Sequence, residues 1–101
     1  MTNTYLDRLK RDARLTILRF LNDAPQYTSN CSMLATLLPS VGITFTRDQV
    51  KTELQWLEEQ SFVALSRPTA NLLVATATRR GVEIATGIAT HDDISRPAPE
   101  F

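Results

Sequence analysis

The chain has few of the residues that build covalent, catalytic or metal-binding structure. It holds one cysteine, Cys31, so no intrachain disulfide can form and the fold must rest on its core. Its only histidine, His91, has no partner at a metal-ligand spacing. The sequence also shows no Ser-His-Asp set, no glycine-rich phosphate loop and no carboxylate pair for acid–base chemistry. We therefore expect a protein that is not an enzyme and uses no metal and no cofactor.

Long apolar runs and an excess of one charge are also missing. No run approaches the roughly 20 apolar residues that cross a bilayer. Residues 1–22 carry Asp7 and Asp12 among their basic residues, so we expect neither a membrane anchor nor a signal peptide, and a reducing cytoplasm as the location. The chain has 11 basic and 11 acidic residues. Because nucleic-acid binders usually carry a basic excess, this balance counts against DNA binding, and any basic face must be local.

The residues that are present suit one small core, since 43% of the 101 residues are hydrophobic. A first helix is predicted over residues 5–21, with Thr4 as its N-cap and Pro25 beyond its end. Its arginines at positions 8, 11 and 14 form a second stripe, which we interpret as a solvated flank rather than a phosphate-binding stripe. Its apolar face, spaced by three and four residues, comprises Leu6, Leu9, Ala13, Ile17 and Phe20.

A short second helix is predicted over residues 30–38. Residues 26–28 before it are β-prone and favour at most a single strand bridge, and Ser29 is the expected N-cap. Cys31, near the helix start, is expected as a half-buried packing residue rather than a reactive thiol. The expected apolar face comprises Met33, Leu34, Leu37 and Leu38.

The third predicted helix is the most sharply bounded. Thr46 and Gln49 have the spacing of a capping box, and the helix extends to about Gln60. Its inward face is predicted to comprise Val50, Leu54 and Leu57, with Trp56 beside them as a core or interface aromatic.

After Ser61 the hydrophobic period changes to that of strands. Residues 62–66 and 72–76 are predicted strands, and the turn-forming residues 67–71 join them as a hairpin. Thr78 then caps a short helix through Thr86, with Gly87 as its C-cap. Gly81 in its first turn weakens that helix unless close packing requires a glycine. Residues 88–101 are expected as an extended or disordered tail.

This order of elements predicts an α+β fold with three helices, a two-stranded hairpin and a short C-terminal helix over residues 1–87. The run 46–63 resembles the recognition helix and next strand of bacterial winged-helix transcriptional regulators, although Ser61-Phe62 stands where glycine-leucine is usual. Residues 77–85 resemble the threonine-x-x-glycine start of their last helix. The whole chain is similar to small proteins of Mu-like transposable phages and prophages. That match rests on Leu54-x-Trp56-Leu57-Glu58-Glu59-Gln60 and on Arg96-Pro97-x-Pro99.

The resemblance implies a winged helix-turn-helix protein that binds duplex DNA in the host cytoplasm, with a regulatory or packaging role. The helix over residues 46–60 is then expected in the major groove and the wing over residues 66–72 on the backbone or minor groove. On the third helix, arginine and glutamine suit bidentate contacts with guanine and adenine edges. Thr52 and Arg67 suit phosphate contacts, and Arg79 and Arg80 lie at a helix start that favours anions. The candidate DNA-binding residues are Arg47, Lys51, Thr52, Gln55, Arg67, Arg79 and Arg80.

Two other interpretations stay open at this point. The polar residues of the third helix, which include Asp48, Glu58 and Glu59, are also compatible with a simple solvated face. The alternative function is a non-catalytic protein-interaction adaptor or dimerisation module, which the neutral net charge and the proline-containing tail favour. A homodimer through the first helix or the tail, or a phage protein partner, is compatible with either function.

Overall fold

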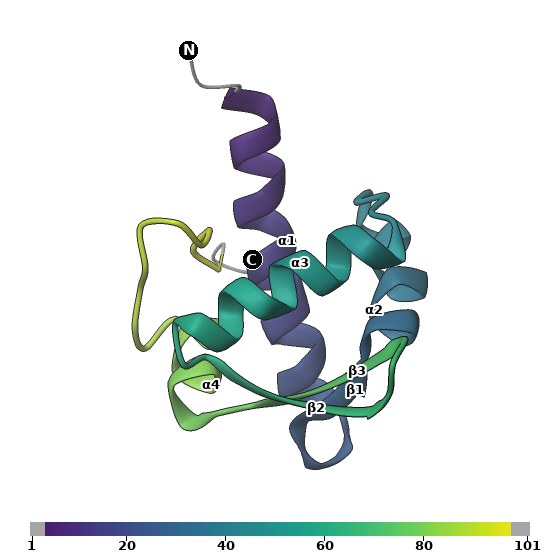
Figure 1. The fold of residues 1–101 in the computed structure, drawn as a ribbon. Helices are drawn as coiled ribbons and strands as arrows, with labels where there is room; N and C mark the ends of the chain where they lie inside the picture. The colour runs from purple at the N-terminus through teal and green to yellow at the C-terminus, as the bar shows by residue number, and fades with distance from the viewer. Residues whose placement is uncertain (1–3, 98–101) are drawn as a thin grey trace.

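The computed structural model describes residues 4–97, which form four α-helices and a three-stranded antiparallel sheet. The sheet lies along the bottom of Figure 1, and α1, α2 and α3 lie above it. The expected α+β class is confirmed. The elements are α1 (Thr4–Asp23), η1 (Pro25–Tyr27), β1 (Thr28–Asn30), α2 (Cys31–Leu37), η2 (Leu38–Val41), α3 (Arg47–Glu59), β2 (Val63–Thr69), β3 (Leu72–Ala77) and α4 (Arg79–Ala85), where η marks a 3-10 helix.

The sheet has the strand order β1-β3-β2, so the last strand in the chain lies at its centre. Thr28 pairs with Thr76 in β3 on one side, and Val63 pairs with Ala77 on the other. Buried and half-buried residues alternate along β3, because successive side chains point to opposite faces of a strand. One face of the sheet is thus closed by the helices.

The core lies between that face and the helices. Apolar residues at helical spacing supply most of it, as the sequence period predicts. Its largest fully buried side chains are Ile17, Leu18, Leu21, Cys31, Leu34, Leu38, Val50, Leu54 and Leu57.

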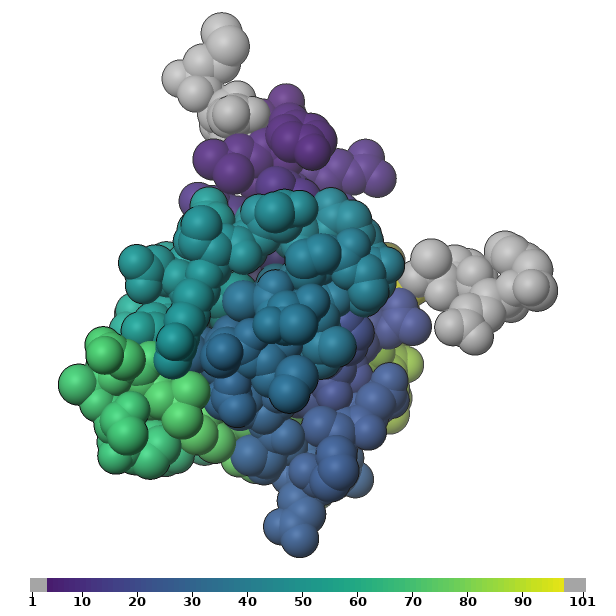
Figure 2. All heavy atoms as spheres, turned by 90° about the vertical axis from the view of Figure 1, so that its right-hand side faces the viewer, coloured from purple at the N-terminus to yellow at the C-terminus, as the bar shows by residue number. Residues whose placement is uncertain are grey.

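The first turns of α1 extend beyond this core. No residue of α1 before Ala13 is buried, and the start of the helix stands above the rest of the molecule (Figures 1 and 2). The predicted inward position of Leu6 is therefore wrong, because 37% of this residue is exposed. Thr4, the expected N-cap, is already part of the helix.

Strand β1, the additional strand of the sheet, was not predicted at its observed place. Gln26 and Tyr27, expected in the β-prone segment, have φ values of 53° and 58° and lie in the tight turn of η1. The chain becomes extended only at Thr28 and then pairs with β3. This pairing joins segments nearly 50 residues apart, so no local period could indicate it.

The boundaries and inward face of α2 also differ from the prediction. The N-cap is Asn30, whose side-chain oxygen accepts a hydrogen bond from the Met33 amide at 2.8 Å, rather than Ser29, which lies in β1. Leu34 is buried as expected, but Met33 and Leu37 are 50% and 37% exposed. A seven-residue helix turns only one stripe to the core, so Met33 and Leu37 stay outside.

The predicted start of α3 is confirmed in detail. The Thr46 hydroxyl accepts a hydrogen bond from the Gln49 amide at 3.1 Å, and the Gln49 side chain accepts one from the Thr46 amide at 2.8 Å. These reciprocal bonds satisfy two of the amides that a helix start leaves free. The predicted inward residues Val50, Leu54 and Leu57 are fully buried.

The hairpin is longer than predicted, and its turn is shorter. Strand β2 continues to Thr69, which pairs with Leu72, so Arg67 and Pro68 lie in a strand rather than in a loop. The register shifts between Ser66 and Thr69. Pro68 fits there because β2 is an edge strand, and an edge strand tolerates a residue that donates no ladder hydrogen bond.

Helix α4 begins as the sequence predicts, with the Thr78 hydroxyl accepting a hydrogen bond from the Gly81 amide at 3.2 Å. Close packing explains why a glycine occupies position 81 in the first turn of this helix. A Cβ at Gly81 would lie 3.1 Å from the carbonyl carbon of Phe62, nearer still to its oxygen, and 3.3 Å from a methyl group of Leu18. Only a glycine lets α4 approach the start of the hairpin and α1 this closely.

Residues 88–97 contain no helix or strand, but they pack on α1. Ile94 is buried, and the Ser95 amide donates a hydrogen bond to the Arg11 carbonyl at 3.2 Å. The Ser95 hydroxyl also donates to the Asp12 carboxylate. This part of the expected tail is thus a bent, irregular segment attached to the domain, while positions 98–101 of that prediction lie outside the described residues.

Candidate nucleic-acid interface

Helix α3 carries four of the candidate residues, on two different sides. Successive residues differ by 100° around a helix, so Thr52 and Gln55 lie near the middle of the open face, opposite the buried leucines. Both are exposed. Arg47 and Lys51, one turn apart, lie on the flank of the helix, where Arg47 is exposed and Lys51 is half-buried. The candidates form a band around the first half of α3 rather than one stripe.

Arg47 joins the start of α3 to the turn of the hairpin. Its Nη2 atom donates a hydrogen bond to the Asn71 carbonyl oxygen at 2.7 Å. The Cys31 thiol at the start of α2 contacts the same oxygen, with a sulfur–oxygen distance of 4.0 Å. Three elements therefore meet at the Asn71 carbonyl. Figure 2 shows the same arrangement, with α2 beside both α3 and the hairpin.

The pKa of the Cys31 thiol reports the local charge at this junction. Burial raises that pKa, but a hydrogen bond with the Leu73 backbone and the nearby Arg47 and Lys51 cations lower it more, so it lies below its ordinary value. The thiol itself is fully buried. The positive charges of Arg47 and Lys51 thus both act on Cys31, where α2, α3 and the hairpin meet, although the chain as a whole is neutral.

Arg67 lies on the hairpin, close to its turn. It is exposed and belongs to β2, two residues before Thr69, where the strand ends. The junction of α3 and the hairpin turn, with Arg47, Lys51, Thr52, Gln55 and Arg67, is named the α3–hairpin surface below.

Arg79 and Arg80 do not belong to the α3–hairpin surface. They follow β3, whose last residue Ala77 pairs with Val63 at the far end of the hairpin. The six residues of β3 place this end about 20 Å from the turn at Asn71. Arg79 is 4.0 Å from the Glu83 carboxylate, and the Arg80 guanidinium lies 5.3 Å from the Phe62 ring centre.

The acidic residues of α3 are distributed unevenly. Glu58 and Glu59 lie at the C-terminal end of the helix, away from Arg47. Asp48 is exposed in the first turn, where a carboxylate stabilises the positive end of the helix. Arg47 and Lys51 therefore have one exposed carboxylate beside them on α3, while Glu58 and Glu59 stand two to three turns away and the fourth acid, Glu53, is buried.

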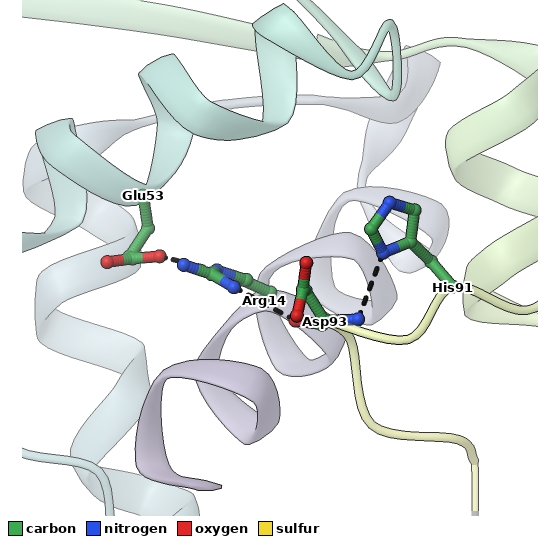
Figure 3. A network of polar contacts seen from close by, with 4 residues as sticks. All are labelled: Arg14, Glu53, His91 and Asp93. Atoms are coloured by element: carbon green, nitrogen blue, oxygen red, sulfur yellow. Dashed lines mark hydrogen bonds and ion pairs between the residues drawn. The ribbon is translucent and has the colours of Figure 1, made fainter. Parts of the chain in front are cut away.

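A second polar cluster, built on Arg14, was not predicted. The Arg14 Nε atom lies 2.7 Å from the Glu53 carboxylate, and 14% and 5% of the two side chains are exposed. A second nitrogen of the guanidinium donates to the Asp93 carbonyl at 3.0 Å (Figure 3). The interpretation of Arg14 as part of a solvated flank is therefore wrong. This side chain ties α1 to α3 and to the segment 91–95.

The only tryptophan and histidine of the chain belong to the same cluster. The Arg14 guanidinium lies 4.0 Å from the Trp56 ring centre, and the His91 ring meets Trp56 and Phe62 edge-on at 5.4 and 5.7 Å. The His91 Nδ1 atom accepts a hydrogen bond from the Asp93 amide at 3.0 Å. These groups hold the segment after α4 in place.

A sequence signal for this cluster existed. Glu53 lies three residues after Val50 and four before Leu57, which places it on the inward stripe of α3. An acid at such a position needs a buried cation as partner. Which cation supplies the charge, 39 residues away, depends on the tertiary structure.

Residues 4–97 contain neither a group of side chains suited to bind a metal ion nor a helix able to span a membrane. This part of the chain brings no three histidine, cysteine, aspartate or glutamate side chains together as ligands. Its helices are also too short or too polar to cross a bilayer.

Comparison with known proteins places the chain in a phage-related family. It is 37% identical to gp26, an uncharacterized protein of Escherichia phage Mu, over 93 residues that cover 92% of this chain and 95% of gp26. It is 32% identical to an uncharacterized protein of Haemophilus influenzae Rd over 97 residues, 96% of this chain and 94% of that protein. The chain belongs to the family that these two proteins represent, which confirms the predicted Mu-like phage relationship. It matches no protein-family model and no solved structure.

Proposed function

We propose that this protein is a winged helix-turn-helix protein that binds duplex DNA through the α3–hairpin surface. The order of its elements supports the fold assignment, because two helices after β1 are followed by a hairpin and the sheet order is β1-β3-β2. In this fold α3 occupies the recognition position and the hairpin is the wing. A phage regulatory or packaging role in the host cytoplasm accords with the family.

The junction at Asn71 is the observation that carries the proposal. One N–H group of Arg47 is used on the Asn71 carbonyl and another interacts with the Cys31 thiol, so the remaining N–H groups stay available for a phosphate or a guanine edge. The hydrogen bond fixes α3 relative to the wing, so Arg47, Lys51 and Arg67 approach a duplex together. Gln55 on the open face then supplies an adenine contact.

The proposed protein is a binder and not a catalyst. The side chains that most often serve as nucleophile or base are already used for packing. Cys31 is fully buried beside Asn71, and His91 packs on Trp56 and Phe62 in a different part of the molecule. A nucleophile and its base need to lie within hydrogen-bond reach.

A salt-dependent titration with matched charge variants tests the proposal. Fluorescence anisotropy of a labelled duplex of about 24 base pairs is followed at about 50 and 200 mM salt. The double variant Arg47→Ala/Lys51→Ala is expected to reduce the slope of log K against log salt by about two, because each phosphate contact contributes about 0.9. The variant Arg79→Ala/Arg80→Ala removes the same charge on the far end of the hairpin and serves as control.

Two results would contradict the proposal. One is the lack of measurable binding at the lower salt concentration. The other is an equal loss of affinity in both double variants, which would show a diffuse charge effect instead of a defined surface. Circular dichroism of both variants checks that each keeps the fold.

A non-catalytic protein-interaction module is the second candidate function. The observation that favours it is the apolar stripe on α2 and η2, where Met33, Leu37 and Val41 follow one another at intervals of four and are all exposed. Exposed apolar groups that cluster in this way often mark protein contacts. Substitution of all three by serine would leave DNA binding intact and abolish capture of a phage protein partner.

A further inference from the structure

A groove on the far side of α1 has the features of a binding site for an anionic ligand. Residues two apart on a helix differ by about 200°, so Arg14 faces α3 whereas Asp12 faces the opposite side. On that opposite side α1, the end of η2 and residues 95–96 enclose a groove of about 410 Å³. This volume falls within the range of small-ligand pockets, roughly 300–1,000 Å³. It is named the α1 groove.

The charges around the α1 groove are predominantly positive. Its lining includes three arginines, Arg8, Arg19 and Arg96, and one carboxylate, Asp12. The Asp12 carboxylate already accepts the hydrogen bond of the Ser95 hydroxyl. The guanidinium groups of Arg8 and Arg96 form no hydrogen bond or ion pair with residues 4–97. A neutral chain thus concentrates a local charge of +2 at one place, with two cations left for a ligand.

The groove also has an apolar part. Leu15 and Ile43 are buried at its base, whereas Tyr5 and Val41 at its edge are 75% and 53% exposed. Tyr5 and Val41 are thus exposed in the same groove as Arg8 and Arg96. This combination suits a ligand that has both carboxylates and an apolar group. Burial of that group would gain about 25 cal/mol for each Å² removed from water.

We propose that the α1 groove binds an acidic peptide segment of a partner protein, with its carboxylates on Arg8 and Arg96 and an apolar side chain between Tyr5 and Val41. Charge complementarity and the apolar edge both favour a peptide. A DNA backbone would bring phosphates to Asp12 and offer nothing to the apolar edge. The groove lies on the side of α1 away from α3, so a protein bound there leaves the α3–hairpin surface accessible, and the proposal is independent of DNA binding.

Selection from a displayed library of random peptides of about 12 residues, on the immobilised full chain, tests this inference. The expected consensus has at least two aspartates or glutamates and a large apolar residue. The synthetic consensus peptide is then titrated against the protein by anisotropy. Its affinity is expected to fall at least about tenfold in Arg8→Glu/Arg96→Glu, and to fall also in Val41→Ser, which leaves the charge unchanged.

The matched control is Arg79→Glu/Arg80→Glu, which changes the net charge by the same amount at a distant place and should keep the affinity. A basic or uncharged consensus, or an equal loss in both charge variants, overturns the proposal. Two further measurements identify other occupants. A dimer in sedimentation velocity that Arg8→Glu/Arg96→Glu dissociates assigns the groove to a second copy of the chain. A loss of duplex affinity in that variant assigns it to nucleic acid. Each of these results also overturns the peptide proposal.

Discussion

The substitution Gly81→Ala offers a sharp test of the packing between α4, the hairpin and α1. In an open helix this change stabilises a protein by up to about 1 kcal/mol, because alanine loses less backbone entropy than glycine. Here the added methyl group would lie 3.1 Å from the Phe62 carbonyl carbon and 3.3 Å from Leu18 Cδ2. Ordinary carbon contacts are about 3.5–4.0 Å, so α4 or the hairpin must move.

The cost of that movement follows from the contacts at the start of α4. Overpacking of a rigid core costs about 1–3 kcal/mol. The shift also strains the hydrogen bond from the Thr78 amide to the Phe62 carbonyl, 3.0 Å, and that from the Thr78 hydroxyl to the Ser61 carbonyl, 2.7 Å. Each such bond contributes about 1 kcal/mol. After the helical gain is subtracted, a net destabilisation of about 2–4 kcal/mol remains, which lowers the Tm by about 10–20 °C.

Thermal and urea unfolding, followed by circular dichroism at 222 nm, measure this effect. Gly42→Ala is the control, because a Cβ there meets nothing within 4 Å and only the left-handed φ of 84° opposes it. That variant should lose about 1–2 kcal/mol. A Gly81→Ala protein as stable as the wild type, or more stable, would refute the close approach of α4 to the hairpin.

Three further predictions concern single interactions. Glu53→Ala leaves Arg14 largely buried without its carboxylate and should lower the free energy of unfolding in urea by about 3 kcal/mol; replacement of both residues by leucine and methionine should recover most of that loss. Thr46→Ala removes the N-cap of α3 and should cost about 1 kcal/mol in the same assay, and a neutral result would contradict the capping box. Arg47→Ala should raise the Cys31 pKa, measured from thiolate absorbance at 240 nm against pH. The pKa of Cys31 is lower in the folded protein than in the unfolded chain, so the free energy of unfolding rises as the pH increases from the folded pKa to the unfolded pKa. This rise should be smaller in Arg47→Ala.

Local patterns were the most reliable guide to the helices. The capping box at Thr46 and the N-cap at Thr78 were predicted at the observed residues, because such bonds join positions three residues apart. The hairpin was also predicted, although its first strand was expected to end before Arg67 and Pro68, which belong to β2. Irregular pairing on an edge strand depends on the partner strand and not on the local period.

The candidate site was predicted only in part. Arg47 and Lys51 were named from their spacing, and the structure places them together beside the hairpin turn. Arg79 and Arg80 were grouped with them because they lie at a helix start, where backbone amides favour anions, but they lie at the other end of the hairpin. A residue type indicates what a side chain can contact, whereas its neighbours follow from the path of the chain.

By itself, the sequence determined where α3 and α4 begin, which stripe of α3 enters the core and that one glycine in α4 needed a packing reason. These properties depend on residues within one or two turns of each other, and their hydrogen bonds and periods are written in the local order. Only the tertiary structure decided that β1 pairs with β3, that Arg14 neutralises Glu53 and that α1 keeps an arginine-lined groove on its far side. Such contacts join residues about 40 to 80 positions apart, and they form because one packed arrangement buries the apolar faces of all the elements together.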